Sequence, residues 1–431
     1  MNRFNNVNDL IVFIESQRRL EKQKDLSEMY AFCEILGNPQ NDLKCIHVTG
    51  TNGKGSVVQY LKDLFINHNF DVATFTSPYI VKFNERICHN NNYISDKDLL
   101  KYGNMIIDKY DEFMDKVSRT PSFFEFITLL AFLYFKSLHV DLAIIEVGIG
   151  GLIDSTNVIN SLAQVIVNVS YDHMNILGNT LPEILIQKLG ITRCNTPLIT
   201  GIKDESLLKV INDYIVNKGI DLYPALFREF EIKKCDLEST QFILEPFGLI
   251  ELKLLGYHQI ENAVVALTTF EVVMNKFNLP IDNEKVKKAM LDTTWPARLE
   301  VLNNSPYIII DGAHNEDGIR RICDFFKDIK VSKQCIFACS DNKEKEKMIK
   351  ELEEVFEKII ITEFTYKRHT DAKLLFENIN QEHKLLITDI NEAIDYVFDK
   401  PQEVNLFVGS LYFTSEIRPI INQKLANFRK R

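Results

Sequence analysis

The stretch that decides the fold is residues 48–56, Val-Thr-Gly-Thr-Asn-Gly-Lys-Gly-Ser, where an apolar run turns into a glycine-rich loop. Its three glycines allow the backbone to curl until several N–H groups point at one anion, and a helix expected from about Ser56 adds its positive dipole end. Lys54 would reach the outer phosphates of a nucleotide, and Ser56 would bind Mg²⁺. The loop differs from the Walker A pattern G-x-x-x-x-G-K-[ST], because Gly55 separates the lysine from the hydroxyl.

The segments on either side of this loop support the same interpretation. Residues 44–48 form a short apolar run of strand length, and residues 56–66 repeat apolar side chains at helical spacing. A flexible turn with a chance lysine is the alternative, but phosphate binding requires the strand–loop–helix context that is found here. The sequence therefore predicts a phosphate site at 48–56.

Composition limits the class of protein. The chain has 431 residues, of which 45% are hydrophobic and 26% charged, and a net charge of −10, so we expect at least two packed domains. The acidic balance gives no general attraction to nucleic acid or anionic membrane, and we expect small-molecule substrates instead. The amino terminus lacks a secretory pattern, and no later run of about 18 residues is free of charge, which predicts a cytoplasmic protein. The eight cysteines include no C-x-x-C pair and are expected to be reduced.

After a largely helical segment at 1–43, predicted strands and helices alternate, which is typical of a mostly parallel sheet. The predicted strands are 44–48, 70–76, 140–147, 163–169 and 197–200, and the predicted helices are 56–67, 96–117, 123–138 and 181–189. Short alternating stretches within 225–256 predict antiparallel strands appended to this sheet, and a helix is predicted near 259–276. The polar cluster at 89–92 is predicted to be a loop tip.

The sequence Thr-Trp-Pro-Ala-Arg at 294–298 interrupts the pattern, and the alternation then restarts. The predicted strands of this part are 306–311, 334–339, 358–362 and 404–408, and the predicted helices are 316–329, 344–356 and 371–379. We therefore predict an α/β fold in which a phosphate-binding domain at 1–295 is followed by a smaller Rossmann-like α/β domain at 296–431.

Polar and titratable residues follow several of the predicted strands. They are Ser77-Pro78-Tyr79, Glu146-Val147-Gly148, Asp172-His173 and Asp311-Gly312-Ala313-His314. Because ligands bind beyond the carboxyl ends of parallel strands, we expect these residues to gather at functional edges of the sheets.

Several short strings, taken in order, resemble the folylpolyglutamate synthase and dihydrofolate synthase family of the Mur ligase superfamily. They are the glycine loop, Thr76-Ser-Pro with Glu85-Arg86-Ile, Glu146-Val-Gly-Ile-Gly-Gly, Asp172-His173 with Leu177-Gly-Asn-Thr-Leu, Lys188-Leu-Gly-Ile, Gly256-Tyr-His-Gln259-Ile-Glu-Asn262-Ala, Trp295-Pro-Ala-Arg298-Leu-Glu, Asp311-Gly-Ala-His314-Asn and Gly409-Ser-Leu-Tyr. The resemblance covers nearly the whole chain. It implies a central-type ATP-binding domain with a folate-site loop, followed by a glutamate ligase domain.

The activity implied by the resemblance is ATP-dependent amide ligation, in which L-glutamate is added to a folate or to dihydropteroate, in folate biosynthesis and one-carbon metabolism. A carboxylate is a poor electrophile, so it must first attack the γ-phosphate of ATP and become an acyl phosphate. The glutamate amine then displaces phosphate. Both steps build charge on oxygen, so the enzyme contributes mainly positioning and electrostatic stabilisation.

By the same resemblance, ATP is bound by residues of both domains. The implied nucleotide-binding residues are Gly53, Lys54, Gly55, Ser56, Gln259, Asn262, Arg298 and Asp311. The residues alone leave other interpretations open, because Arg298 would also suit an ion pair and Asn262 a helix-surface amide.

Ser77, Glu146 and His173 match the Mg²⁺ ligands of that family, and Lys188 matches its carbamylated lysine. An unpaired carboxylate at the end of an apolar strand is costly to bury, and a metal ion would remove that cost at Glu146. Imidazole is a less usual ligand of Mg²⁺, so His173 alone would suggest a structural histidine. Lys188 has a solvated helix lysine as its alternative.

The implied catalytic residues are Lys188, His173 and His314, although His314 would equally suit a helix cap. Phe124 and Arg86 match substrate-binding positions, the first beside the pterin pocket and the second in the loop 77–95. A core position is the alternative for Phe124.

The chain departs from the family pattern at three places. Leu152 stands where the family has arginine, Ala297 where it has glycine, and Asp341-Asn-Lys-Glu where it has Asp-Lys-Asp. Losing a guanidinium near phosphate is not conservative. A non-catalytic or substrate-shifted paralogue therefore remains an alternative, as does a cell-wall Mur-type amino-acid ligase. The family resemblance implies a monomer.

Overall fold

The computed structural model describes residues 2–18, 25–341, 343–365, 369–377, 379, 382 and 384–428. Asn342 of the 341–344 string lies outside the described residues, as do residues 1 and 19–24 of the predicted helical segment and residue 378 of a predicted helix. The chain divides into two compact units, each described separately below. The first contains residues 1–230, 244–248 and 261–292, and the second contains residues 231–243, 249–260 and 293–431.

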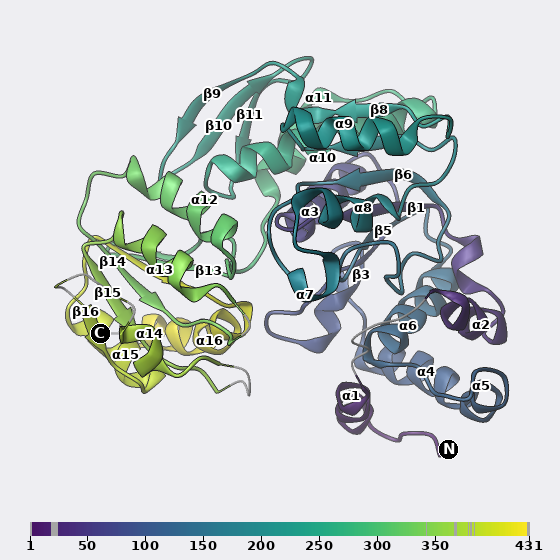
Figure 1. Cartoon of the computed structure of the whole chain (residues 1–431), viewed down its shortest axis with the longest axis horizontal. Helices are drawn as coiled ribbons and strands as arrows, with labels where there is room; N and C mark the ends of the chain where they lie inside the picture. The colour runs from purple at the N-terminus through teal and green to yellow at the C-terminus, as the bar shows by residue number, and fades with distance from the viewer. Residues whose placement is uncertain are drawn as a thin grey trace. The chain divides into compact units, whose positions relative to one another are not determined.

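The first unit is built on an eight-stranded sheet of order β4-β3-β2-β5-β1-β6-β7-β8 (Figure 1). Its strands are β1 (Cys45–Thr49), β2 (Val72–Phe75), β3 (Ile87–His89), β4 (Asn92–Tyr93), β5 (Leu142–Glu146), β6 (Ser161–Ile166), β7 (Leu198–Thr200) and β8 (Leu222–Pro224). The adjacent strands in the series β2-β5-β1-β6-β7-β8 pair in parallel. Strand β3 pairs antiparallel with both β2 and β4. The prediction of a mostly parallel sheet is confirmed, and the loop tip at 89–92 is the turn between β3 and β4, where Asn90 has a φ of 51°.

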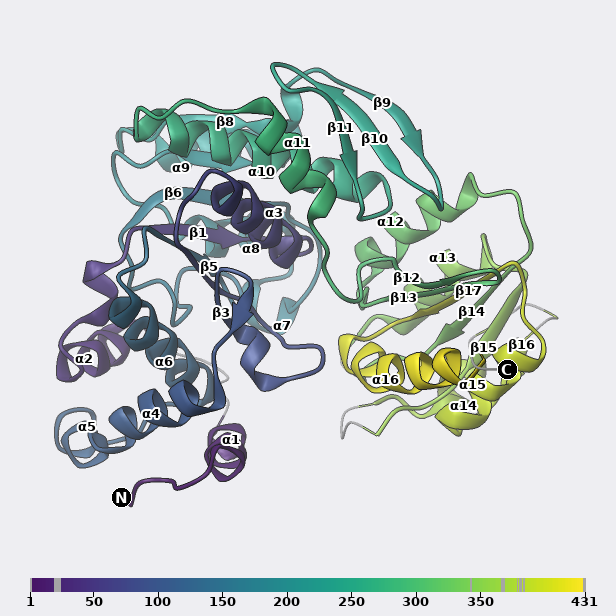
Figure 2. The same ribbon diagram turned by 180° about the vertical axis from the view of Figure 1, so that it is seen from behind.

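The helices of this unit carry the apolar periodicity that the sequence shows. They are α1 (Val7–Ser16), α2 (Ser27–Ile35), α3 (Lys54–Asn67), α4 (Asp96–Ile107), α5 (Tyr110–Val117), α6 (Phe123–Leu138), α7 (Met174–Leu177), α8 (Leu181–Leu189), α9 (Glu205–Ile215) and α11 (Asn283–Asp292). Figures 1 and 2 show α1, α2, α4, α5 and α6 grouped together, where their apolar side chains join those of β2 and β5 in one core. The single helix predicted at 96–117 is wrong, because Asp108 and Lys109 separate α4 from α5.

Strands β9 (Phe230–Cys235), β10 (Thr240–Leu244) and β11 (Gly248–Leu252) form a sheet of their own. The prediction that these strands extend the first sheet is therefore wrong. Pro224 ends β8 and has no N–H to donate, and the short 3₁₀ helix Ala225–Phe227 carries the chain away before β9 begins. The helix α10 (Tyr257–Lys276) follows and contributes to both units.

The second unit has a six-stranded sheet of order β12-β13-β17-β14-β15-β16. Its strands are β12 (Glu300–Asn304), β13 (Tyr307–Asp311), β14 (Lys333–Phe337), β15 (Lys358–Ile361), β16 (Lys384–Leu386) and β17 (Val404–Val408). Among the described strands of this sheet, β12 pairs antiparallel with β13, and the other neighbours pair in parallel. Its helices are α12 (Glu316–Lys327), α13 (Lys345–Glu353), α14 (Ala372–Glu377), α15 (Ile390–Asp399) and α16 (Leu411–Phe428).

Figures 1 and 2 show α12 and α13 on one face of this sheet and α15 and α16 on the other, an α/β/α arrangement that agrees with the predicted Rossmann-like fold. No helix in the described part of the chain is long and apolar enough to cross a membrane.

Candidate functional site

The glycine loop connects β1 to α3, and Gly53 is the residue on which α3 begins. Gly53 has a φ of 78°, a left-handed conformation that glycine adopts without steric cost. The helix starts at Lys54, two residues before the predicted start, so its N-terminal N–H groups face the loop. The Lys54 ammonium donates to the carbonyl oxygens of Gly50 and Thr51, each at 3.1 Å. The loop thus presents a cation and a helix N-terminus together, as phosphate binding requires.

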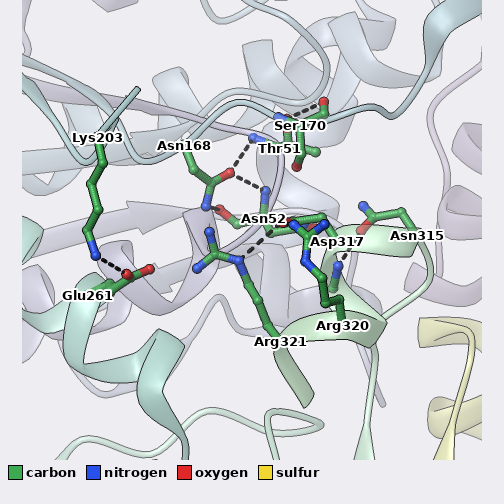
Figure 3. Close-up of polar contacts among 11 residues, drawn as sticks. Thr51, Asn52, Asn168, Ser170, Lys203, Glu261, Asn315, Asp317, Arg320 and Arg321 are labelled. Carbon is green, nitrogen blue, oxygen red and sulfur yellow. Dashed lines mark hydrogen bonds and ion pairs between the residues drawn. The ribbon is translucent and has the colours of Figure 1, made fainter. Parts of the chain in front are cut away.

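Asn168, which follows β6, holds this loop in shape (Figure 3). Its Oδ1 accepts from the N–H groups of Thr51 and Asn52 at 3.2 and 2.9 Å, and its Nδ2 donates to the Asn52 carbonyl at 3.0 Å. Ser170 completes the contact, because its N–H donates to Thr51 Oγ1 at 3.0 Å. Sequence reasoning missed Asn168. Its position at the carboxyl end of a predicted strand was the available signal.

Asn262, on α10, lies directly against Gly53. A Cβ atom added to Gly53 would be 2.4 Å from Asn262 Oδ1, so only glycine leaves room for this amide. The neighbouring Glu261 pairs with Lys203 at 2.6 Å (Figure 3). The amide that the sequence assigned to nucleotide binding is therefore beside the loop, rather than on a remote helix surface.

Glu146 is the last residue of β5 and is buried. Its Oε2 accepts from the Ser77 N–H at 3.1 Å, which brings two of the predicted metal ligands together. Among the described residues there is no group of three or more His, Cys, Asp or Glu side chains that could hold a metal ion. Mg²⁺ in nucleotide sites is usually bound by one or two protein side chains, with phosphate oxygens and water as its other ligands. A buried carboxylate beside one serine is suited to such an ion.

The glycine turn after Glu146 is fixed by a buried polar network. Asp154 Oδ2 accepts from the Ile149 N–H at 3.0 Å, and Asp154 Oδ1 accepts from Thr156 Oγ1 at 2.6 Å. Thr156 also bonds to the Nε2 of His47 at 2.9 Å. Burial, with a smaller effect from the charge of Arg193, lowers the pKa of His47 to about 3, so this histidine is neutral.

Lys188 lies near the end of α8 and is buried, so the alternative of a solvated helix lysine is wrong. Burial, together with the charge of Lys54, lowers its pKa to about 7, and Asp172 opposes this shift. The backbone of α8 closely approaches the glycine turn: a Cβ on Gly190 would lie 2.4 Å from the Cα of Leu152. The Leu152 side chain itself is 42% exposed.

His173 adopts a left-handed φ of 51° at the start of α7, with its Nε2 4.0 Å from Asp172 Oδ1. Phe124 packs near Phe75, with ring centroids 5.8 Å apart, and a Cβ on Gly148 would lie 2.7 Å from the Phe124 ring. Phe124 is therefore part of the wall behind the glycine turn.

Arg86 is buried among aromatic rings. Its guanidinium lies 5.0 Å from the ring centre of Tyr79, 5.8 Å from that of Phe83 and 5.4 Å from that of Phe123. Cation–π attraction stabilises such an arrangement.

The remaining predicted residues belong to the second unit. Gln259 is buried near the start of α10. Asp311, at the end of β13, accepts from the N–H groups of Leu299 and Ala313, both at 2.7 Å. Burial raises the pKa of Asp311, and the nearby Arg298 opposes that shift. The structure thus places Arg298 near a carboxylate that is also held by backbone N–H groups.

His314 does not cap the helix that follows it. Its Nδ1 bonds to the Gly312 carbonyl at 2.9 Å, whereas Asn315 Oδ1 accepts from the Gly318 N–H at 2.8 Å and caps α12. On the first turns of α12, Asp317 pairs with Arg320 at 2.6 Å and with Arg321 at 3.1 Å (Figure 3). Sequence reasoning missed this cluster.

Comparison with known proteins gives matches over both units. The model of the Mur ligase middle domain matches residues 48–270, and the model of the Mur ligase glutamate ligase domain matches residues 297–411. The chain is 33% identical over 417 residues to the dihydrofolate synthase/folylpolyglutamate synthase of Bacillus subtilis, covering 94% of this chain and 97% of that protein.

Solved structures give the same result. The apo form of L. casei FPGS superposes with a TM-score of 0.85 at 29% identity, covering 96% of this chain and 99% of that one. An FPGS–AMPPCP–folate complex superposes with a TM-score of 0.83 at 28% identity, again covering 96% and 99% of the two chains. Together with the loop at 48–56, these matches establish that the chain belongs to the folylpolyglutamate synthase/dihydrofolate synthase family of ATP-dependent Mur-type ligases.

Proposed function

We propose that this protein adds L-glutamate to a reduced folate, to dihydropteroate or to both, at the expense of ATP. The observation that carries the proposal is the glycine loop, where Lys54, the N-terminus of α3 and the Asn262 amide converge on one turn. The similarity to the dihydrofolate synthase/folylpolyglutamate synthase of Bacillus subtilis and to an FPGS–AMPPCP–folate complex supports the choice of substrates.

In the proposed reaction, a carboxylate oxygen of the pterin substrate attacks the γ-phosphorus of ATP, and the bond to the β-phosphate oxygen breaks to release ADP. The amine of glutamate then attacks the carbonyl carbon of the acyl phosphate, loses a proton, and expels inorganic phosphate. Lys54 and the N–H groups of the loop would balance the charge of the transferred phosphoryl group. Arg298, Asp311 and Gln259 are the nucleotide-binding candidates of the second unit, and His314 is placed to contact an anion there.

Ser77, Glu146 and His173 are the residues that would hold Mg²⁺ with the nucleotide phosphates, and Lys188, as a carbamate, would bridge to or support a second ion. Bound Mg²⁺ neutralises phosphate charge. The burial of Glu146 favours this role, since a carboxylate in that position gains from a cation.

We propose that Lys188 reacts with CO₂ to give a carbamate. The neutral amine is the nucleophile, it forms an N–C bond to CO₂, and one proton leaves. With a pKa of about 7, roughly half of the Lys188 amines are neutral at pH 7, against about one in three thousand for an ordinary lysine. Removing CO₂ and bicarbonate should lower activity, and adding bicarbonate should restore it, whereas a Lys188→Met variant should not respond. Equal activity with and without bicarbonate would contradict the carbamate.

Product analysis by mass spectrometry tests the main proposal. Purified protein, Mg²⁺, ATP and glutamate are incubated with dihydropteroate and with tetrahydrofolate separately, and each productive substrate gains one glutamyl residue. ADP release must require both the pterin and glutamate. If no pair gives product, the ligase proposal is refuted.

A non-catalytic paralogue that binds ATP and folate is the second candidate, and Leu152 is the observation that favours it. The alternative predicts binding of both ligands in calorimetry without turnover, and turnover gained on Leu152→Arg. The 42% exposure of Leu152 means that an arginine can be introduced there without burying its charge. A wild-type protein that forms product excludes this candidate.

We further expect a cytoplasmic monomer that binds Mg²⁺, and no polynucleotide partner, given the net charge of −10. Light scattering coupled to size-exclusion chromatography would test the oligomeric state. A mass of twice the chain would contradict it.

A further inference from the structure

The turn at 297–299 has an unusual backbone. Ala297 has a φ of 54° and Leu299 a φ of 41°, and both side chains are buried. Residues with a Cβ seldom occupy the left-handed region, and such residues persist only where their surroundings hold them. Arg298 lies between the two. The orientation of its guanidinium therefore depends on whatever holds this turn.

Arg298 Nη1 donates to the Ala297 carbonyl at 2.9 Å, so the guanidinium is itself bonded to the turn. Three further hydrogen bonds hold the turn, and two of them end on carboxylates. The Ala297 carbonyl accepts from the Gly312 N–H at 2.9 Å, and the Leu299 N–H donates to Asp311 Oδ2 at 2.7 Å. The Ala297 N–H donates to Glu300 Oε2 at 2.9 Å. Each of the two left-handed residues is thus tied to one acidic side chain.

Glu300 is in turn held by Arg418, which lies 118 residues further along the chain on α16. Arg418 Nη2 donates to Glu300 Oε1 at 2.7 Å, and Arg418 Nε lies 3.1 and 3.0 Å from the two carboxylate oxygens. A guanidinium that contacts both oxygens fixes the carboxylate plane as well as its position. The pair is largely shielded, with Arg418 26% and Glu300 19% exposed.

We propose that the Glu300–Arg418 ion pair is a positioning device for Arg298, because it keeps the Ala297–Leu299 turn in its left-handed conformation. Glu300 and Arg418 act through the turn and need no contact with the nucleotide. The proposal rests on the proposed function, in which Arg298 binds ATP. Without the pair, Ala297 relaxes toward negative φ and Arg298 leaves its position.

Substitution of Arg418 tests the proposal through the binding of a non-hydrolysable ATP analogue, measured by calorimetry. Arg418→Met is expected to weaken analogue binding and to raise the KM for ATP about tenfold, which is about 1.4 kcal/mol, while kcat falls less. Arg418→Lys keeps the charge without the two-point contact and should give an intermediate loss. Because Arg298→Met removes the positioned group, adding Arg418→Met to it should weaken binding no further.

Rescue by glycine gives the sharpest outcome. Glycine adopts positive φ freely, so Ala297→Gly combined with Arg418→Met should recover most of the lost affinity. A merely structural role for Arg418 would give no such recovery, and its absence overturns the proposal.

The matched control is Arg228, whose ion pair with Glu271 in the first unit has almost the same exposure, 26% and 20%. Arg228→Met should leave analogue affinity unchanged. Wild-type-like binding by Arg418→Met also overturns the positioning role. Because binding is measured without turnover, a wild-type protein that binds the analogue but forms no product refutes the ligase proposal alone.

Discussion

Replacing Gly53 with alanine separates two demands that the structure makes on this residue. The first is conformational, since a φ of 78° costs an alanine about 1–2 kcal/mol. The second is spatial, since the new Cβ would lie 2.4 Å from Asn262 Oδ1 and 3.0 Å from its Cγ. Atoms at the end of a side chain can rotate away, so we expect Asn262 to move rather than the fold to fail.

Gly37 provides a control of the same chemistry. Its φ is 77°, and nothing lies within 4 Å of the Cβ that an alanine would add. Gly37→Ala therefore carries the conformational cost without the collision. Both variants should lower the melting temperature by a similar few degrees, because about 1 kcal/mol corresponds to roughly 2–4 °C in a domain of this size.

Binding of the ATP analogue should distinguish the two variants. If Asn262 binds the nucleotide as proposed, moving its amide forfeits one hydrogen bond, worth about 0.5–1.5 kcal/mol. Gly53→Ala should then weaken binding by roughly twofold to tenfold. Gly37→Ala should bind as the wild type does. With Asn262→Ala as background, the collision disappears and Gly53→Ala should have only its conformational cost.

Three results would refute this reasoning. Equal analogue affinity of Gly53→Ala and wild type would mean that Asn262 does not contact the nucleotide. An equal loss of analogue affinity in Gly37→Ala and Gly53→Ala would show that backbone strain alone weakens binding. If Gly53→Ala lowers analogue affinity by the same factor in the Asn262→Ala background, the collision with Asn262 is not the cause of the loss.

Further predictions concern the stability of the first unit and the loop anchor. Arg119 Nη1 lies 2.7 Å from the buried Glu125 carboxylate, and Arg119→Met leaves that carboxylate without its charge partner. The substitution should lower the free energy of unfolding, measured in urea, by about 3 kcal/mol. The exposed Arg3 is the control, and its replacement should have no measurable effect on that free energy. His47 has a pKa near 3 when folded and about 6.5 when unfolded, so the unfolded state binds more protons in between and stability falls as pH drops from 6.5 toward 3. His47→Gln should reduce that acid-induced loss, and an unchanged dependence of the melting temperature on pH would contradict the assignment. Asn168→Ala should raise the KM for ATP about tenfold, through loss of the hydrogen bonds that shape the loop, and an unchanged KM would show that the loop holds its shape without them.

Local patterns predicted the parallel core and the loop at its edge with good accuracy. The predicted strands at 44–48 and 404–408 differ by at most one residue from β1 and β17, because a buried parallel strand is a continuous apolar run. The sheet formed by β9, β10 and β11 was misplaced, because alternation within a strand says nothing about which sheet the strand joins.

The positions of the candidate site residues could be predicted where a motif carries its own geometry, whereas contacts between distant residues could not. The loop follows β1 directly, and Glu146 and Asp311 are the last residues of β5 and β13, so their positions could be anticipated. The pairing of Glu300 with Arg418 spans 118 residues and has no local pattern. The burial of Lys188 was equally hidden, because charge in a helix usually indicates solvent.

The contact between Gly190 and Leu152 limits which substitutions the glycine turn after Glu146 can accept. The two backbones meet within 2.4 Å of a Cβ position, so the path of the chain is set by main-chain atoms and by the absence of a side chain at 190. The Leu152 side chain takes part in the same contact, because its Cβ and Cδ1 atoms would lie 2.5 and 2.8 Å from that Cβ position, although the side chain is 42% exposed. A side chain at position 190 therefore has no room beside residue 152, whereas a longer group at position 152 can extend to solvent on its exposed side. A substitution at position 190 would thus displace the glycine turn from the end of α8, the helix that carries Lys188.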